Sequence, residues 1–386
     1  MLKVLVIGAG TMGSVHATAY ADMTQAELVG VVDIRLSAAE AVAAKLQTKA
    51  FKSFEAALAS EDIDVVDICV PTYLHRRYVE QVAGAGKHVV CEKPMARNLE
   101  DAQAMIEACE GAGVQLFIAQ VVRFFPEYRR AHDLVIKGAI GEVGNARAFR
   151  GGVFPTAWND WYANVELSGS LIVDLMIHDF DFLRWCFGDV ERVYAKSQLG
   201  RELNRTDHAL VSLRFKNGII AHVEGSWAYP SGFRTELEIT GTKGMITHDS
   251  AATAAIHKQL RSSGGQNGGK EGSSVAVPES PLRKSPYQLE LEHFMDCLRT
   301  GTDPLVTAED AYKALEISFC ALKSARTGEP VNVGEPMASG KVVPASSGAG
   351  ASAVTVASTS TATGTQASTA TSISTPSTAT ATGKGE

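Results

Sequence analysis

The chain has 386 residues, 45% of them hydrophobic, and carries a formal net charge of −7. At roughly 100–200 residues per domain, this length predicts two domains and an additional segment. The acidic balance and the lack of a long basic run argue against nucleic acid as a partner. Because no apolar run approaches the roughly 20 residues that a bilayer span needs, and the N-terminus reads as a strand and not a signal peptide, we expect a cytoplasmic protein with no membrane partner.

Residues 2 to about 120 alternate between short apolar runs and amphipathic stretches. The apolar runs are typical of strands buried on both faces, and strand–helix alternation predicts a parallel, doubly wound Rossmann sheet. The expected strands are Leu2–Ile7, Leu28–Val32, Val65–Val70, His88–Cys91 and Gln115–Ala119, and the expected helices are Thr11–Ala21, Ser37–Leu46, Leu74–Ala83 and Leu99–Glu110.

After Gln120 the pattern changes to several strands with short connections, which predicts an α+β domain with a large, open, mostly antiparallel sheet. The expected helices are Glu127–Ile136, Gly169–Phe187, Pro286 to about Thr300, and Ala308–Arg326; the expected strands are Glu142–Arg150, Val190–Ser197, His208–Phe215, Ile219–Trp227, Arg234–Thr240 and Met245–Thr247. We therefore expect a nucleotide-binding domain over residues 1–120 and a substrate and oligomerisation domain over 121–335.

Two segments have a composition that predicts no packed structure. Gly264–Gly272 is rich in glycine and serine and is expected to form a mobile surface loop. Residues 336–386 consist mainly of Ala, Ser, Thr and Gly, with too little large apolar surface to offset the entropy of ordering, so we expect a disordered tail.

The first strand is followed by Gly8-Ala9-Gly10-Thr11-Met12-Gly13 and then by a helix. This is the glycine fingerprint of a dinucleotide site, in which the pyrophosphate approaches the backbone at the helix N-terminus. Asp33 ends the second strand, where a carboxylate binds the adenosine ribose and repels a 2′-phosphate, so NAD is favoured over NADP; the nearby Arg35 argues weakly the other way. The predicted cofactor contacts here are Gly8, Gly10, Thr11, Met12, Gly13 and Asp33.

Two further groups of residues indicate a reaction centre. Glu92-Lys93-Pro94 lies at the carboxyl edge of the predicted sheet, although a surface salt bridge between Glu92 and Lys93 would also explain it. Asp174, His178 and Asp181 share one face of the predicted helix, and a histidine beside a carboxylate suits proton abstraction from an alcohol. A helix-terminal carboxylate with a core histidine, or a metal site, are alternatives; we expect no metal, because hydride transfer to NAD needs none when a base is present.

In this order, the glycine fingerprint, Val70-Pro71-Thr72-Tyr73-Leu74-His75, Glu92-Lys93-Pro94 and the segment GSLIVDLMIHDFD at residues 169–181 resemble the glucose–fructose oxidoreductase/inositol dehydrogenase family, Gfo/Idh/MocA. The resemblance covers about residues 1–335. It implies a catalytic set of Lys93, Asp174 and His178, and cofactor contacts at Pro71, Thr72, His75, Glu92 and Lys93. It also implies a second-domain sheet that pairs with another subunit, as a homodimer or homotetramer.

The expected function is NAD-dependent oxidation of a secondary alcohol in an inositol-like polyol or a sugar. The predicted substrate contacts are Lys93, Arg123, Trp161, Asp174, His178 and Asp181. A dehydrogenase of a sugar nucleotide is an alternative, and a cofactor-binding regulator without turnover is a second alternative from another class.

Overall fold

The structure, a computed structural model, describes residues 1–199, 207–252, 256–260 and 284–335. The predicted Rossmann sheet is confirmed as six parallel strands in the order β3-β2-β1-β4-β5-β6. The strand order reverses beside β1, and ligands of such sheets bind outside the carboxyl ends of the strands at that point. The strands are β1 (Leu2–Ile7), β2 (Ala26–Val32), β3 (Lys49–Phe51), β4 (Val65–Ile68), β5 (His88–Glu92) and β6 (Leu116–Ala119).

Alternate residues of these strands supply two apolar cores, one on each face of the sheet. In β1, Val4 and Val6 belong to one core, and Leu5 and Ile7 belong to the other. The helices and turns of this half are α1 (Thr11–Ala21), α2 (Leu36–Leu46), α3 (Phe54–Leu58), η1 (Thr72–Leu74), α4 (His75–Gly84), α5 (Leu99–Ala112) and η2 (Val121–Phe124). The short elements β3 and α3 were not predicted.

The second sheet has eight strands in the order β13-β12-β11-β7-β10-β9-β8-β14. Adjacent strands of this sheet run antiparallel, except for β7 and β10, which run parallel to each other. The prediction of a mostly antiparallel sheet is therefore confirmed. The strands are β7 (Val143–Val153), β8 (Val190–Gln198), β9 (His208–Phe215), β10 (Ile220–Ser226), β11 (Ala228–Gly241), β12 (Gly244–Asp249), β13 (Ile256–Leu260) and β14 (Val331–Asn332). The short strands β13 and β14 were not predicted.

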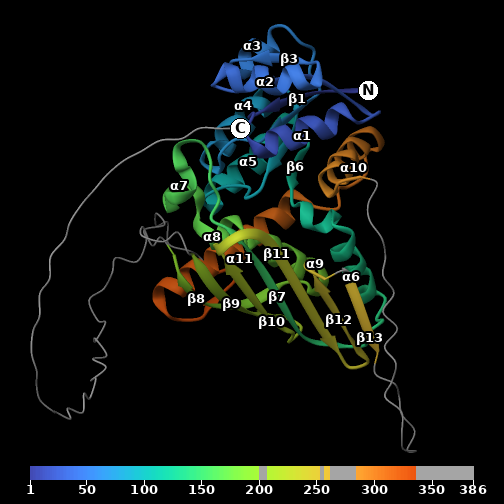
Figure 1. Cartoon of the computed structure of the whole chain (residues 1–386), viewed down its shortest axis with the longest axis vertical. Helices are drawn as coiled ribbons and strands as arrows, with labels where there is room; N and C mark the ends of the chain where they lie inside the picture. Colours follow the sequence, from blue (N-terminus) through green and yellow to red (C-terminus); the bar gives the residue numbers. More distant parts are fainter. Residues whose placement is uncertain (200–206, 253–255, 261–283, 336–386) are drawn as a thin grey trace, which may run out of the picture. The chain divides into compact units, whose positions relative to one another are not determined.

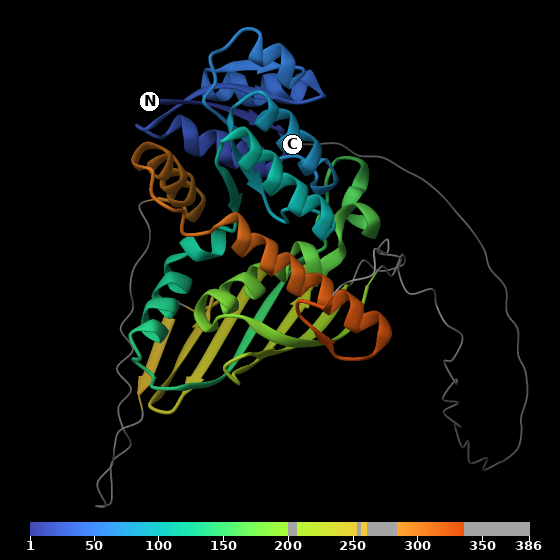
Figure 2. The ribbon, with the colours of Figure 1, turned by 180° about the vertical axis from the view of Figure 1, so that it is seen from behind.

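Helices cover one face of this second sheet. Figure 2 shows α6 (Pro126–Ile136), α9 (Ile177–Phe187) and α11 (Ala308–Thr327) against it, and Figure 1 shows no described helix over the other face. The alternation follows from the sequence, because Val211 and Leu213 on β9 are buried whereas Leu210 is 52% exposed.

Two C-terminal helices pack on the Rossmann half. Phe294 on α10 (Pro286–Thr300) stacks on Phe117 of β6, with ring centroids 4.8 Å apart. The first half of α11 joins the Rossmann core through Leu315, and its second half joins the core of the second sheet through Ile317 and Ala321. The predicted boundary at residue 120 therefore separates the two sheets but not the helices that cover them. The predicted loop Gly264–Gly272 and the tail from residue 336 lie outside the described residues.

The prediction of one continuous helix over Gly169–Phe187 is wrong. The segment forms α8 (Ser170–Asp174) and α9, preceded by η3 (Trp158–Ala163) and α7 (Val165–Ser168). At the break, the amide of Met176 binds the carbonyl of Leu171 at 3.1 Å, one residue beyond the helical spacing. The Met176 side chain fills the space that Gly225 of β10 leaves open, because a Cβ there would overlap it.

Candidate active site

The glycine fingerprint forms a turn between β1 and α1 that suits a pyrophosphate. Gly8 has φ of +110°, and a Cβ on Gly13 would overlap the carbonyl of Gly8, so both positions require glycine. A Cβ on Gly10 would meet no protein atom within 4 Å, which leaves room for a ligand at the N-terminus of α1. Thr11 is exposed and Met12 is half-buried beside it. These residues fit the dinucleotide that the sequence predicts.

Asp33 lies at the end of β2 and braces the same turn. Its Oδ2 accepts a hydrogen bond from the Ala9 amide at 3.0 Å, and its Oδ1 accepts one from the Arg35 amide at 2.8 Å. The Arg35 guanidinium turns back to Asp33 at 3.3 Å and lies 5.6 Å from the ring centroid of Trp158. Arg35, the residue that would favour NADP, is therefore paired with Asp33, the residue that favours NAD.

Pro71, Thr72 and His75 form the next part of the predicted cofactor site, between β4 and α4. Pro71 is half-buried and Thr72 is buried. His75 is 1% exposed, with Nδ1 3.0 Å from the Pro94 carbonyl and Nε2 2.9 Å from the Val70 carbonyl. The structure thus places the His75 ring as a brace between two loops and not at the surface that faces a cofactor.

Lys93 meets Asp174 at the break between α8 and α9. Its Nζ donates to the Asp174 carbonyl at 2.8 Å and lies 3.4 Å from the Asp174 carboxylate. The amide of His178, four residues on, would bind the Asp174 carbonyl in a continuous helix, but no such bond spans the break between α8 and α9 in the described residues, so the lysine binds this carbonyl. Burial raises the pKa of Asp174, and Lys93 opposes that shift. The break in the helix therefore creates this contact.

His178 is the second residue of α9 and is 9% exposed. Burial lowers its pKa well below the usual value, and the charges of Lys93 and Arg150 lower it further, so the ring is neutral. Its Nδ1 has no hydrogen-bond partner among the described residues. The neighbouring Arg150 is held by Asp179 through two bonds of 2.8 and 2.9 Å. A neutral imidazole with an unused nitrogen can accept a proton.

Aromatic side chains from η3 lie beside these polar groups. Trp161 is 8% exposed, stacks on Tyr162 with centroids 4.0 Å apart, and meets Tyr73 of η1 edge-on. Burial raises the pKa of Tyr162, and the carboxylates of Asp174 and Glu92 raise it further. Trp161 thus contributes to the site through Tyr162, with its own ring largely covered.

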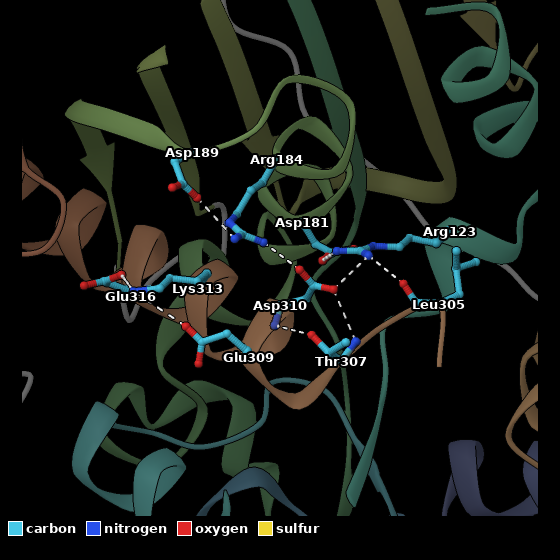
Figure 3. A network of polar contacts seen from close by, with 10 residues as sticks. All are labelled: Arg123, Asp181, Arg184, Asp189, Leu305, Thr307, Glu309, Asp310, Lys313 and Glu316. Carbon is cyan, nitrogen blue, oxygen red and sulfur yellow. Dashed lines mark hydrogen bonds and ion pairs between the residues drawn. The ribbon is translucent and has the colours of Figure 1, made fainter. Parts of the chain in front are cut away.

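Arg123 and Asp181 lie in a separate buried network, shown in Figure 3. The Arg123 guanidinium donates to both Asp181 oxygens at 2.8 and 2.6 Å, and to the Leu305 carbonyl at 2.8 Å. Asp310 of α11 bridges Arg123 and Arg184 at 3.2 and 2.6 Å. Since Arg123 and Asp181 are 2% and 1% exposed, the structure does not bring these two predicted substrate contacts to Lys93. The break separates Asp174 from the helix α9 that carries both His178 and Asp181, so the three predicted residues do not share one continuous helix.

Sequence reasoning missed a buried polar group next to Lys93. His16 of α1 lies between Asp67 of β4 and Glu92 of β5, and all three side chains are under 10% exposed. One signal was available, since Asp67 stands in the middle of an apolar strand, where a charge is costly unless it is paired.

Comparison with known proteins identifies the family. An oxidoreductase family with an NAD-binding Rossmann fold matches residues 2–120, and the GFO/IDH/MocA C-terminal domain matches residues 128–247. The scyllo-inositol 2-dehydrogenase (NAD(+)) of Bacillus subtilis is 30% identical over 346 residues, which cover 86% of this chain and 96% of that protein. The chain belongs to the Gfo/Idh/MocA family. The myo-inositol 2-dehydrogenase of Thermotoga maritima, another relative, is 29% identical over 86% of this chain and 99% of its own length.

Solved structures agree with this membership. The crystal structure of GenD2 from gentamicin A biosynthesis, in complex with NAD, is 26% identical and covers 86% of this chain and 96% of its own, with a TM-score of 0.75. As a Gfo/Idh/MocA protein the chain is an NAD-dependent oxidoreductase, which confirms the predicted enzyme class and cofactor. Within the described residues, no helix is both long enough and apolar enough to cross a bilayer.

Proposed function

We propose that this oxidoreductase acts on a secondary alcohol of a cyclic polyol or sugar, inositol-like in kind, through Lys93, Asp174 and His178. One observation carries the proposal: the Lys93 ammonium lies 2.8 Å from the Asp174 carbonyl, and its charge acts on a neutral His178 whose Nδ1 has no partner among the described residues. Two relatives that match nearly the whole folded chain are inositol dehydrogenases by name, which supports the substrate class.

Each of the three residues has a distinct part in the proposed reaction. NAD, when bound, supplies the acceptor for the hydride. His178 takes the hydroxyl proton, because its imidazole is neutral and one nitrogen is unused. Lys93 donates a hydrogen bond to the same oxygen and stabilises the negative charge that develops on it. Asp174 holds the ammonium in place through its carbonyl and carboxylate.

The surroundings favour a neutral substrate. Among the described residues, the cations beside His178 already have carboxylate partners: Lys93 is paired with Asp174, and Arg150 with Asp179. A diphosphate group would need further cations. Tyr162 and Trp227 meet edge-on near Asp174, and aromatic faces of this kind pack against the C–H face of a polyol ring.

The test is a substrate panel. Purified protein is incubated with NAD⁺ or NADP⁺ and with myo-inositol, scyllo-inositol, free hexoses or UDP-hexoses, and reduced nicotinamide is followed by absorbance. We expect the highest kcat/KM with NAD⁺ and an inositol or free sugar. Turnover confined to UDP-hexoses would favour the sugar-nucleotide alternative, and NADH binding without turnover of any compound would favour the regulator.

A further inference from the structure

A buried ion-pair chain lies beneath the dinucleotide turn, outside the proposed catalytic set. His16 of α1 is 0% exposed, with Nδ1 2.9 Å from Oδ2 of Asp67 and Nε2 3.2 Å from Oε1 of Glu92. Asp67 is also 0% exposed and Glu92 is 7% exposed, so water screens these contacts little. The three side chains come from α1, β4 and β5, which meet at the edge of the sheet where ligands bind.

The geometry specifies the charge on His16. Nδ1 is hydrogen-bonded to Asp67, and Nε2 lies at ion-pair distance from Glu92 without hydrogen-bond geometry. Because each ring nitrogen lies beside a carboxylate, the surroundings favour the imidazolium form of His16. Cys69, Tyr287 and Glu290 also lie near the ring, and Tyr20 lies near Asp67. Cys69 lies 3.4 Å from Nδ1. Burial raises the pKa of Glu290 well above its usual value, which favours its neutral acid form.

Glu92 connects this imidazolium to Lys93. Its Oε1 faces His16, and its Oε2 accepts a hydrogen bond from the backbone amide of Lys93 at 3.0 Å. On the other side of Lys93, the Pro94 carbonyl lies 3.0 Å from the His75 ring. The backbone that carries the lysine is thus held on both sides, and its Nζ is directed to Asp174.

We propose that His16 is a positioning residue for Lys93, acting through Glu92. The inference rests on the proposed function, because it assumes that Lys93 contacts the reacting oxygen. The ion pairs of His16 connect α1, whose first turn forms the nucleotide site, to the end of β5 that carries the lysine. Loss of the His16–Glu92 contact frees the Glu92 carboxylate to rotate and loosens the Lys93 amide. A displacement of about 1 Å at a reacting group can lower turnover by about 100-fold.

The experiment uses full-length protein and two substitutions of His16. An asparagine amide reaches the position of Nδ1 and keeps only the bond to Asp67, whereas a glutamine amide reaches the position of Nε2 and keeps a donor for Glu92. The first readout is acetylation of Lys93 by limiting acetic anhydride, measured by peptide mass spectrometry. We expect acetylation of Lys93 to rise severalfold in His16→Asn and to return toward the wild-type rate in His16→Gln. Glu92→Gln removes the charge that pairs with the His16 ring, so it should also raise the acetylation of Lys93.

The second readout is kcat with myo-inositol and NAD⁺, alongside NADH binding by fluorescence. His16→Asn should lower kcat by about 10–100-fold and leave the NADH Kd within about twofold of the wild-type value. The control is Asp310→Asn, which breaks the separate Arg123 network. It should lower Tm and leave both kcat and the acetylation of Lys93 unchanged. Unchanged Lys93 acetylation in folded His16→Asn and Glu92→Gln overturns the inference. Full turnover by Lys93→Ala instead overturns the proposed function, whichever result His16 gives.

Discussion

The His178 imidazole is kept neutral by its surroundings, and this has a consequence for the pH dependence of turnover. Burial is the largest cause of its lowered pKa, followed by Lys93 and Arg150. Because the neutral form is the base, activity is lost only as pH falls through the lowered pKa. We therefore expect the acid limb of kcat/KM to lie below pH 6.5, the ordinary value for histidine, in a profile measured from pH 4.5 to 9.

The matched variant is His178→Ala, which should lower kcat by about 10²–10⁴-fold and leave the NADH Kd nearly unchanged. A purely structural role predicts a lower Tm with normal turnover per folded molecule. Measuring Tm beside kcat separates the two, and a folded His178→Ala enzyme with full turnover would falsify the proposed mechanism.

The position of Asp33 leads to a prediction about the choice between NAD and NADP. Its carboxylate repels a 2′-phosphate, and it also holds the Arg35 guanidinium at 3.3 Å. Asp33→Ser removes the repulsion and releases the arginine, so the ratio of kcat/KM for NADP⁺ to that for NAD⁺ should rise at least about tenfold. The double variant Asp33→Ser/Arg35→Ala should lose most of that gain. An unchanged ratio in the single variant would show that other groups select the cofactor.

Individual site residues differ in how well sequence could predict them. The glycines, Lys93, Asp174 and His178 stand in local motifs whose spacing carries chemical meaning. His16 does not, because its partners Asp67 and Glu92 lie on other elements and meet only in the folded sheet. Arg123 and Asp181 have the right residue types for substrate binding, but their charges are neutralised within a network completed by Asp310, more than 100 residues further along the chain.

At the scale of elements, the break between α8 and α9 is the main departure from expectation. Apolar periodicity continues through Leu175 and Met176, so it predicts an unbroken helix. The packing of Met176 against Gly225 on β10 and the contact of Lys93 with the Asp174 carbonyl come from distant parts of the chain. The strand β1, a continuous apolar run, and the helix α1, which follows the glycine fingerprint, were predicted with their bounds. The two- or three-residue strands β14 and β3 have too few residues to show a pattern.

The entry into α8 gives a stability prediction. Gly169 has φ of +78°, and an added Cβ would lie 2.8 Å from the Cβ of Val173. Gly169→Ala is therefore both strained and overpacked, and we expect it to lower the free energy of unfolding by about 1–3 kcal/mol and to lower turnover by displacing Asp174. Gly111 in α5 is the control, since a Cβ there meets no atom within 4 Å; Gly111→Ala should keep or raise the free energy of unfolding by up to about 1 kcal/mol. Denaturant titrations of the two variants compare them directly.

At the scale of the whole molecule, the sheet face that no described helix covers predicts association. Tyr194, Leu210 and Ile220 are between 37% and 52% exposed on strands whose other face is covered by helices (Figure 1). Large apolar side chains exposed on a sheet face, here interspersed with polar neighbours, are often buried against a partner subunit. We expect a homodimer or homotetramer by light scattering at micromolar concentration, and dissociation by Leu210→Glu but not by Ile136→Glu, which places the same charge on α6. A wild-type monomer under these conditions would contradict the prediction.

Helix α11 contributes to the apolar cores of both sheets, and α10 packs on the Rossmann core although it follows the second sheet in the sequence. This arrangement restricts how family members can exchange parts. A chimera joined at residue 120 would pair one parent's nucleotide-binding sheet with the other parent's α10 and α11, so that side chains such as Phe117 and Phe294 would come from different sources. Grafting a new cofactor preference onto this chain would therefore need residues 1–120 together with residues 286–315, transplanted as one set.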